Sequence, residues 1–308
     1  MKQTQQILPV LHALRKKNVV DFFRTITLDS YTECFPRHKR SIENMVNLAI
    51  DILVDSQSIS IDVNSFHAAQ TYIKTNLFPS SPTSWFRTAY ESYKILKRPQ
   101  IDYDKIKTYI KGEKILDFGA GAGFFAHELV KHGYSVQLTD VLDYRSAFVR
   151  DLEFVLMVEP RVLPFRDNSI DTAIVRTVLH HINNADLSSI LKELHRIARR
   201  IIIEEDTCGI HPEDTQFSMA TQNSIFLEHF MSLSVQDQFD YAVLTDYFSN
   251  AIVFGASDIN FPFLFKSPLD WKKTLKEHNF TVSDTLFIGF EKMKITKNCQ
   301  IWFIADRS

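Results

Sequence analysis

The chain has 308 residues, of which 45% are hydrophobic, so it can bury one large apolar core and a smaller one. Its 35 basic and 37 acidic residues nearly cancel to a net charge of −2, which provides no strong field for nucleic acid or an anionic membrane and slightly favours a small substrate. Cys34, Cys208 and Cys299 lie far apart, with no C-x-x-C pair, so the sequence suggests neither a disulfide framework nor a zinc site.

The first hundred residues carry helical patterns. Apolar residues recur at spacings of three and four, prolines and polar stretches separate the segments, and no glycine occurs before Gly112. No apolar run approaches the roughly 18 residues that a membrane span needs, so we expect no span. The scattered cysteines favour a reduced, cytoplasmic setting. We predict a helical extension or cap over residues 1–100, which either covers part of the functional site or is only a scaffold. Its helices are expected over residues 10–23, 41–53, 65–77 and 85–96.

A glycine-rich stretch, KILDFGAGAGFFAHEL over residues 114–129, indicates a buried strand, a tight turn and a helix. Glycine has no Cβ, so Gly119, Gly121 and Gly123 allow positive φ and let the backbone approach a ligand above the strand end. An ordinary glycine turn in an α/β domain is the alternative. A dinucleotide site would read G-x-G-x-x-G, whereas Phe124 stands at the last expected position here.

Asp117 also argues against a dinucleotide. A carboxylate at the strand end would repel a pyrophosphate, but it is a good acceptor for an ammonium group, which S-adenosylmethionine carries. With its acidic-x-G-x-G-x-G pattern, this stretch resembles the first motif of the class I S-adenosylmethionine-dependent methyltransferases. The resemblance implies a Rossmann-like, doubly wound domain over residues 101–308.

Two further acidic residues follow predicted strands. Asp140 ends a strand over residues 135–139, at the position where doubly wound folds place an acceptor for ribose hydroxyls. Glu159 ends an apolar run over residues 154–158, and the resemblance implies that it accepts a hydrogen bond from the adenine amino group. Pro160 and Arg161 depart from the small residues that often come next in the family.

A fourth strand is predicted over residues 172–178, with His180 and His181 just past its carboxyl end, where open α/β sheets bind ligands. The pattern LPFxDxSIDxA…LHHI resembles the fourth-strand motif of the small-molecule, type 11-like branch of these methyltransferases, and the resemblance covers roughly residues 112–206. The predicted cofactor-binding residues are Asp117, Gly119, Ala120, Gly121, Gly123, Asp140, Val141, Glu159, Arg176 and Thr177.

The rest of the chain completes the sheet and adds an insertion. Glu204, Glu205 and Asp206 end a fifth strand; they could bind substrate or form a base, but we favour a solvated strand end. Residues 207–268 are rich in Phe and Met and predict a substrate lid, with Phe226, Phe230 and Phe261 lining the acceptor pocket. The connection between the predicted strands over residues 285–290 and 299–305 is too short for a parallel crossover. We therefore predict an antiparallel pair in a seven-stranded, mostly parallel sheet.

These features favour a methyltransferase that takes S-adenosylmethionine, releases S-adenosylhomocysteine and methylates oxygen, nitrogen or carbon of a small, partly apolar acceptor. His181, or failing it His180, is the predicted base, because an ordinary imidazole pKa of about 6.5 suits deprotonation near neutrality. Alternatives are a non-catalytic cofactor-binding module and a nicotinamide-dependent dehydrogenase, which Asp117 and Phe124 disfavour. Neither a nucleic-acid partner nor a resident metal is expected, and the oligomeric state is left open.

Overall fold

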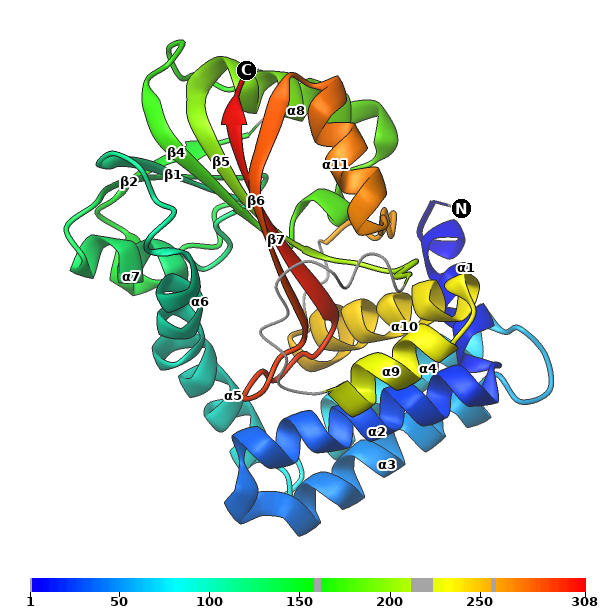
Figure 1. Cartoon of the computed structure of the whole chain (residues 1–308). Helices are drawn as coiled ribbons and strands as arrows, with labels where there is room; N and C mark the ends of the chain where they lie inside the picture. The colour runs from blue at the N-terminus through cyan, green and yellow to red at the C-terminus, as the bar shows by residue number, and fades with distance from the viewer. Residues whose placement is uncertain (1, 158–161, 212–223, 256–258) are drawn as a thin grey trace.

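The computed structural model describes residues 2–157, 162–211, 224–255 and 259–308. At its centre is a seven-stranded sheet in the order β3-β2-β1-β4-β5-β7-β6 (Figure 1). Within the described chain, β7 alone runs against its neighbours, so the predicted antiparallel pair and the mostly parallel, Rossmann-like sheet are confirmed. The strands are β1 (Lys114–Phe118), β2 (Ser135–Asp140), β3 (Glu153–Leu156), β4 (Ile170–Arg176), β5 (Ala198–Asp206), β6 (Phe280–Phe290) and β7 (Cys299–Arg307).

Helices cover both faces of the sheet. Successive side chains of a strand point to opposite faces, so each strand packs against helices on both sides. Ile115 of β1 packs in one apolar cluster with residues of α6 (Arg98–Ile106) and α7 (Phe124–Lys131). Its neighbour Leu116 belongs to the other cluster, together with Leu191 of α8 (Asn184–Ile197) and Trp271 of α11 (Pro268–Glu277). Since both faces are covered, the strands β1, β4 and β5 are almost entirely buried, and each has apolar residues along its middle.

A layer of helices lies beyond the carboxyl ends of the parallel strands (Figure 1). Helix α10 of the insertion contacts α1 and α2, so the N-terminal helices and the insertion build this layer together. The domain boundary near residue 100 remains a prediction. The helices of the layer are α1 (Lys2–Leu14), α2 (Lys17–Cys34), α3 (Lys39–Asp55), α4 (Val63–Tyr72) with its π-helical continuation (Ile73–Leu77), α5 (Trp85–Leu96), α9 (Ser224–Ser232) and α10 (Val235–Tyr247), which continues as the π-helix η6 (Phe248–Val253).

The single helix predicted over residues 10–23 is wrong, because the chain breaks between α1 and α2. Lys16 has an extended backbone, with φ −97° and ψ 102°, and directs its ammonium group to α10. There its Nζ lies 2.9 Å from Asp237 and 2.5 Å from Asp240. The apolar spacing continues across this break, so periodicity alone did not locate it.

The tip of the β6–β7 hairpin ties the sheet to the helical layer. Lys297 in this tip is buried, and its Nζ lies 2.6 Å from Asp29 and 2.7 Å from Glu33 of α2. The Ser30 hydroxyl donates to the backbone carbonyl of Lys294 at 2.5 Å. The hairpin therefore holds the helical layer against the ligand-side edge of the sheet.

Candidate active site

The glycine turn after β1 has the backbone that only glycine adopts without strain. Gly119, Gly121 and Gly123 have φ of 70°, 54° and 74°. A Cβ on Gly119 would lie 2.4 Å from Val178, and one on Gly123 would lie 2.4 Å from Val149, so these two glycines also allow close packing. A Cβ on Gly121 would meet no described atom within 4 Å. Of the three glycines in this turn, Gly121 is therefore the one with open space beside its backbone.

Asp140 at the end of β2 holds this turn. The N–H of Gly121 donates to its Oδ2 at 2.8 Å, and the N–H of Val141 donates to its Oδ1 at 2.7 Å. Burial raises the pKa of Asp140, although these N–H groups act in the opposite direction. Val141 is half exposed beside it, and Ala120 is partly buried. Each carboxylate oxygen retains a lone pair, so Asp140 can accept further hydrogen bonds from a ligand.

Asp117 lies beneath the same turn, with only 3% of its surface exposed. Its Oδ2 has no hydrogen-bond partner among the described residues. Burial raises the pKa of Asp117 to about 6, the charge of Arg176 lowers it, and the carboxylate of Asp140 raises it further. Since a buried acceptor without a partner is costly, this carboxylate is suited to a cationic donor that binds above β1.

Arg176 at the end of β4 belongs to an ionic network with α6. Its guanidinium group pairs with Asp102 of α6, its Nε lies 3.3 Å from Glu204, and its Cζ lies 4.3 Å from the ring centroid of Phe125. Thr177 has a φ of 51° and donates its N–H to the Glu204 carbonyl at 2.7 Å. The cofactor contacts of Arg176 and Thr177 stay predictions, while the pairing with Asp102 was missed because α6 was not predicted.

The three carboxylates at the end of β5 are buried, which overturns the prediction of a solvated strand end. Glu204, Glu205 and Asp206 are 1%, 0% and 5% exposed. Glu204 accepts from Arg98 at 2.7 Å and from Lys294 at 3.1 Å, while Asp206 accepts from side-chain amides of β7 and the turn before it. Adjacent charges looked too costly to bury from the sequence, but distant residues supply a partner for each.

Glu205 organises the turn that carries the histidine pair. Its Oε1 accepts from the N–H groups of Val178 and Leu179, and its Oε2 lies 2.6 Å from Nδ1 of His180. Burial alone would lower the pKa of His180, but the carboxylates of Glu205 and Asp246 outweigh it and raise the pKa well above its ordinary value. The two carboxylates therefore favour the charged form of this buried histidine.

His181 has a different environment. Its Nδ1 lies 2.9 Å from the backbone carbonyl of Asn260, and its Nε2 lies 3.5 Å from Oδ1 of Asp246 in α10. Burial lowers its pKa, as does the neighbouring His180, so His181 is neutral near pH 7. Phe261 meets the His181 ring edge-on at 5.7 Å between centroids. Asp246 and Asn260 come from the insertion and gave no signal in the sequence.

The predicted lid aromatics occupy different environments. Phe261 lies against His181, and its place in an acceptor pocket stays a prediction. Phe230 is instead fully buried among Phe22, Tyr241 and Phe290, so its predicted place in the pocket is wrong. Phe226 is partly buried at the edge of that aromatic cluster. Glu159 lies outside the described residues, and its predicted contact with adenine stays a prediction.

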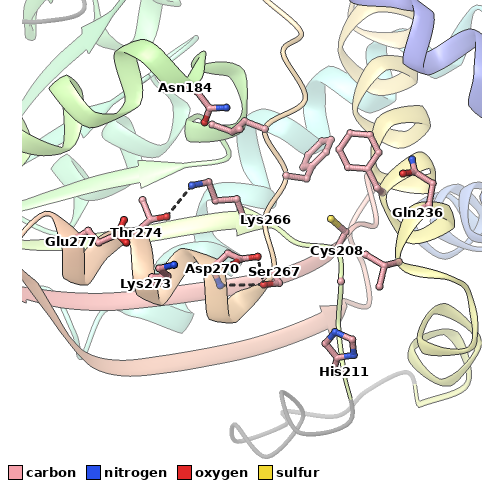
Figure 2. A pocket seen from close by; sticks show the side chains of 15 residues that line it. Asn184, Cys208, His211, Gln236, Lys266, Ser267, Asp270, Lys273, Thr274 and Glu277 are labelled. Carbon is pink, nitrogen blue, oxygen red and sulfur yellow. Dashed lines mark hydrogen bonds between the residues drawn. The ribbon is translucent and has the colours of Figure 1, made fainter.

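An open pocket of about 660 Å³ lies between α10 and α11 (Figure 2). Lys266 donates to Thr274 at 2.9 Å on one side of it, and Gln236 and Cys208 line the other. None of the predicted site residues lines this pocket. Phe265 connects the two regions, because it lines the pocket and stacks on the His180 ring at 4.9 Å.

Residues 116–200 match the family model Methyltransf_11, described as a methyltransferase domain. Together with the seven-stranded topology, this match supports a class I S-adenosylmethionine-dependent methyltransferase domain that includes residues 116–200. No curated protein matches the chain. In the described part of the chain, no helix is both long and apolar enough to cross a membrane.

Several solved structures are similar to this chain. One is a SAM-dependent methyltransferase from Aquifex aeolicus, with 15% identity and a TM-score of 0.42, covering 70% of this chain and 92% of that one. A SAM-dependent methyltransferase from Methanosarcina mazei has 18% identity and a TM-score of 0.46, covering 67% and 97%. The magnesium protoporphyrin IX methyltransferase of Synechocystis PCC 6803, solved with bound SAH, has 15% identity and a TM-score of 0.44, covering 79% and 99%.

Proposed function

We propose that this chain transfers the methyl group of S-adenosylmethionine to oxygen, nitrogen or carbon of a small, partly apolar acceptor and releases S-adenosylhomocysteine. The observation that carries the proposal is the buried Asp117 carboxylate, whose Oδ2 has no partner in the described chain. It lies beneath a turn in which the open side of Gly121 meets no described atom, within the residues that match a methyltransferase family. This combination fits a ligand that carries an ammonium group and no phosphate.

Different residues of the chain would contact different parts of that cofactor. Asp117 would accept the ammonium group, and Asp140 would accept the ribose hydroxyls with the lone pairs that Gly121 and Val141 leave free. Bound S-adenosylmethionine supplies a methyl group on a positively charged sulfur. The other proposed contacts are Gly119, Ala120 and Gly123 in the turn, Arg176 and Thr177 after β4, and Glu159 at the adenine.

His181 is our first choice for the base on the acceptor, with His180 second. Its lowered pKa leaves it neutral near pH 7, and part of its side chain is exposed. His180 is less suitable, because it is enclosed and charged between Glu205 and Asp246. Glu205 and Asp206 are weaker candidates, because a backbone N–H and the His180 imidazole already occupy the oxygens of Glu205, and side-chain amides occupy those of Asp206.

The apolar part of the acceptor would lie against the aromatic side chains beside the histidine pair. Phe261 contacts His181, and Phe265 contacts His180. Because both rings are themselves largely buried, they offer a dry surface next to the proposed base. We propose that residues 207–268 act as the lid through this aromatic segment.

Calorimetry with S-adenosylmethionine, S-adenosylhomocysteine and NAD tests the cofactor assignment. Binding of the first two but not the third supports it, while binding of NAD alone would replace it with a dehydrogenase. Incubation with S-adenosylmethionine labelled in its methyl group and a cell extract then tests catalysis. A labelled small molecule identifies the acceptor, whereas cofactor binding with no labelled product across extracts favours the non-catalytic module.

A further inference from the structure

Three side chains with metal-ligating atoms converge beyond the carboxyl end of β4. His180 and His181 belong to the short helix η4 (Leu179–His181), and Asp246 belongs to α10. Nε2 of His180 lies 3.7 Å from Oδ1 of Asp246, and Nε2 of His181 lies 3.5 Å from the same oxygen. The ligand atoms of all three residues lie within 4.8 Å of one another. Ligands that share one ion at about 2.0 to 2.2 Å are roughly 3 to 3.5 Å apart, so the two distances to Asp246 already lie close to this range, and the three side chains would draw together around an ion.

The contacts at Nδ1 of the two rings leave both Nε2 atoms on the side that faces Asp246. A backbone carbonyl only accepts, so Nδ1 of His181 donates to Asn260, and a neutral His181 has its lone pair on Nε2. Nδ1 of His180 faces the carboxylate of Glu205 at 2.6 Å in the same way. Metal-binding histidines usually have this arrangement, in which the second nitrogen donates to a carboxylate or a carbonyl. Both Nε2 atoms therefore face Asp246.

Asp246 itself lacks a partner for one of its oxygens. The side chain is only 4% exposed, Oδ1 accepts from Asn250 at 2.7 Å, and Oδ2 has no hydrogen-bond partner in the described part of the chain. A buried, incompletely paired carboxylate is costly unless a cation compensates it. Asn250 lies in the π-helix η6, a geometry that is rare and frequent at functional sites.

We propose that His180, His181 and Asp246 bind one divalent transition-metal ion, with Glu205 and the Asn260 carbonyl orienting the two imidazoles. Two imidazole nitrogens and one carboxylate favour zinc-like ions over Mg²⁺ or Ca²⁺, which prefer ligand sets made only of oxygen. Three protein ligands leave a coordination position open, as in catalytic rather than structural metal sites. The sequence analysis missed this site because Asp246 is distant from the histidines in the chain.

The metal site deepens the proposed function, and the role of the ion in catalysis rests on that proposed function. An ion at this position would hold an oxygen or nitrogen of the acceptor and lower its pKa, which would replace the direct role of His181 as a base. The aromatic rings of Phe261 and Phe265 beside the histidines would keep that position dry. Metal binding itself can be measured without S-adenosylmethionine or an acceptor.

The full chain, stripped with a chelator and then dialysed, is titrated with Zn²⁺ by calorimetry and with Co²⁺ by visible absorption. We expect one ion per chain, d–d bands typical of nitrogen and oxygen ligands, and a higher Tm with Zn²⁺. Asp246→Asn and His181→Ala should weaken Zn²⁺ binding by about 100-fold or more, and Glu205→Gln, which changes only an orienting group, by roughly 10- to 100-fold.

His132→Ala is the matched control, because His132 is a surface histidine of similar chemistry whose Nε2 lies 3.3 Å from the single carboxylate of Glu128. It should bind Zn²⁺ as the wild type does. Circular dichroism of each metal-free variant identifies any that fail to fold, and the isosteric Asp246→Asn is the variant expected to fold best. Equal Zn²⁺ affinity in folded Asp246→Asn and wild type, or no stoichiometric binding by wild type, would overturn the proposal. Loss of S-adenosylmethionine binding with intact Zn²⁺ binding would instead count against the proposed function alone.

Discussion

The N–H of Gly121 donates to Oδ2 of Asp140 at 2.8 Å, so the cofactor turn and the end of β2 are held by one hydrogen bond. Asp140→Ala removes this bond and the predicted acceptor for ribose hydroxyls together. We expect a loss of about 1.5 to 3 kcal/mol in binding of S-adenosylmethionine, which is roughly a ten- to hundred-fold rise in Kd by calorimetry. Asp140→Asn keeps one carbonyl acceptor and should lose less. Equal affinity of Asp140→Ala and wild type would refute the placement.

The glycines of the turn should separate folding from binding. Gly119→Ala combines a φ of 70° with a Cβ only 2.4 Å from Val178, so we expect it to destabilise the fold by about 2 to 4 kcal/mol in urea unfolding. Gly121→Ala has a φ of 54° but meets no described atom within 4 Å. It should remain folded, with a strain of about 1 to 2 kcal/mol, and bind S-adenosylmethionine weakly.

Gly133→Ala is the control for this comparison. Gly133 also has a positive φ, 89°, and open space around it, but it lies between α7 and β2, at the far end of the sheet from the turn. It should show the same backbone strain with no change in Kd. If Gly121→Ala and Gly133→Ala bind the cofactor equally well, Gly121 does not face the ligand.

Asp117→Asn should stabilise the free protein while weakening binding. Burial raises the pKa of Asp117 from an ordinary 3.8 to about 6, so the folded state disfavours its charge. One pKa unit is worth about 1.4 kcal/mol, so ionised Asp117 costs on the order of 3 kcal/mol at pH 7, a cost that disappears as the pH falls from above 6 towards 4. We expect a higher Tm without ligand for Asp117→Asn at pH 7.

The same residue predicts how binding depends on pH. The ammonium group needs the ionised carboxylate, so affinity of the wild type for S-adenosylmethionine should fall as the pH drops through about 6. In Asp117→Asn, affinity should be roughly ten- to a hundred-fold lower at pH 7 and lack this acid limb. Calorimetry from pH 5 to 7.5 measures both effects. An unchanged acid limb in the variant would assign the titration to another group.

Glu204→Gln should be strongly destabilising. Burial alone would raise the pKa of Glu204, but Lys294, Arg98 and Arg176 lower it well below its ordinary value of 4.5. Its stabilising effect is therefore present at neutral pH and is lost only in acid. Loss of this charge leaves buried cations incompletely paired, at a cost of about 3 to 5 kcal/mol in urea unfolding. The control is Glu91→Gln, which breaks an exposed pair with Arg87 on α5 and should leave stability unchanged.

Phe261→Ala should raise the KM for the acceptor more than the Kd for S-adenosylmethionine, because Phe261 contacts His181 rather than the glycine turn. Its matched control is Phe230→Ala, which removes the same side chain from the aromatic cluster with Phe22 and Phe290. That variant should lower stability by about 3 to 5 kcal/mol. Thermal unfolding and steady-state kinetics distinguish the two outcomes. If Phe261→Ala only loses stability, Phe261 is a core residue and does not line the acceptor pocket.

The sequence by itself determined the features that depend on neighbouring residues. The turn between β1 and α7 followed from Asp117 and three glycines, because only glycine accepts those φ values without strain. The antiparallel β6–β7 pair followed from a connection that is too short for a crossover. The resemblance to a methyltransferase family followed from motifs within residues 116–200. These signals lie within a few residues of one another, so they can be read along the chain.

Tertiary structure alone decided which distant groups meet. The carboxylates of Glu204, Glu205 and Asp206 look like a solvated cluster in the sequence, yet α6, the hairpin and η4 supply partners that allow their burial. Asp246 reaches the histidine pair because α10 lies in the helical layer beyond the carboxyl ends of the parallel strands, and no local pattern encodes that approach. The cost of burying a charge depends on its partners in space, which is why the chemistry of this edge could not be derived from residue order.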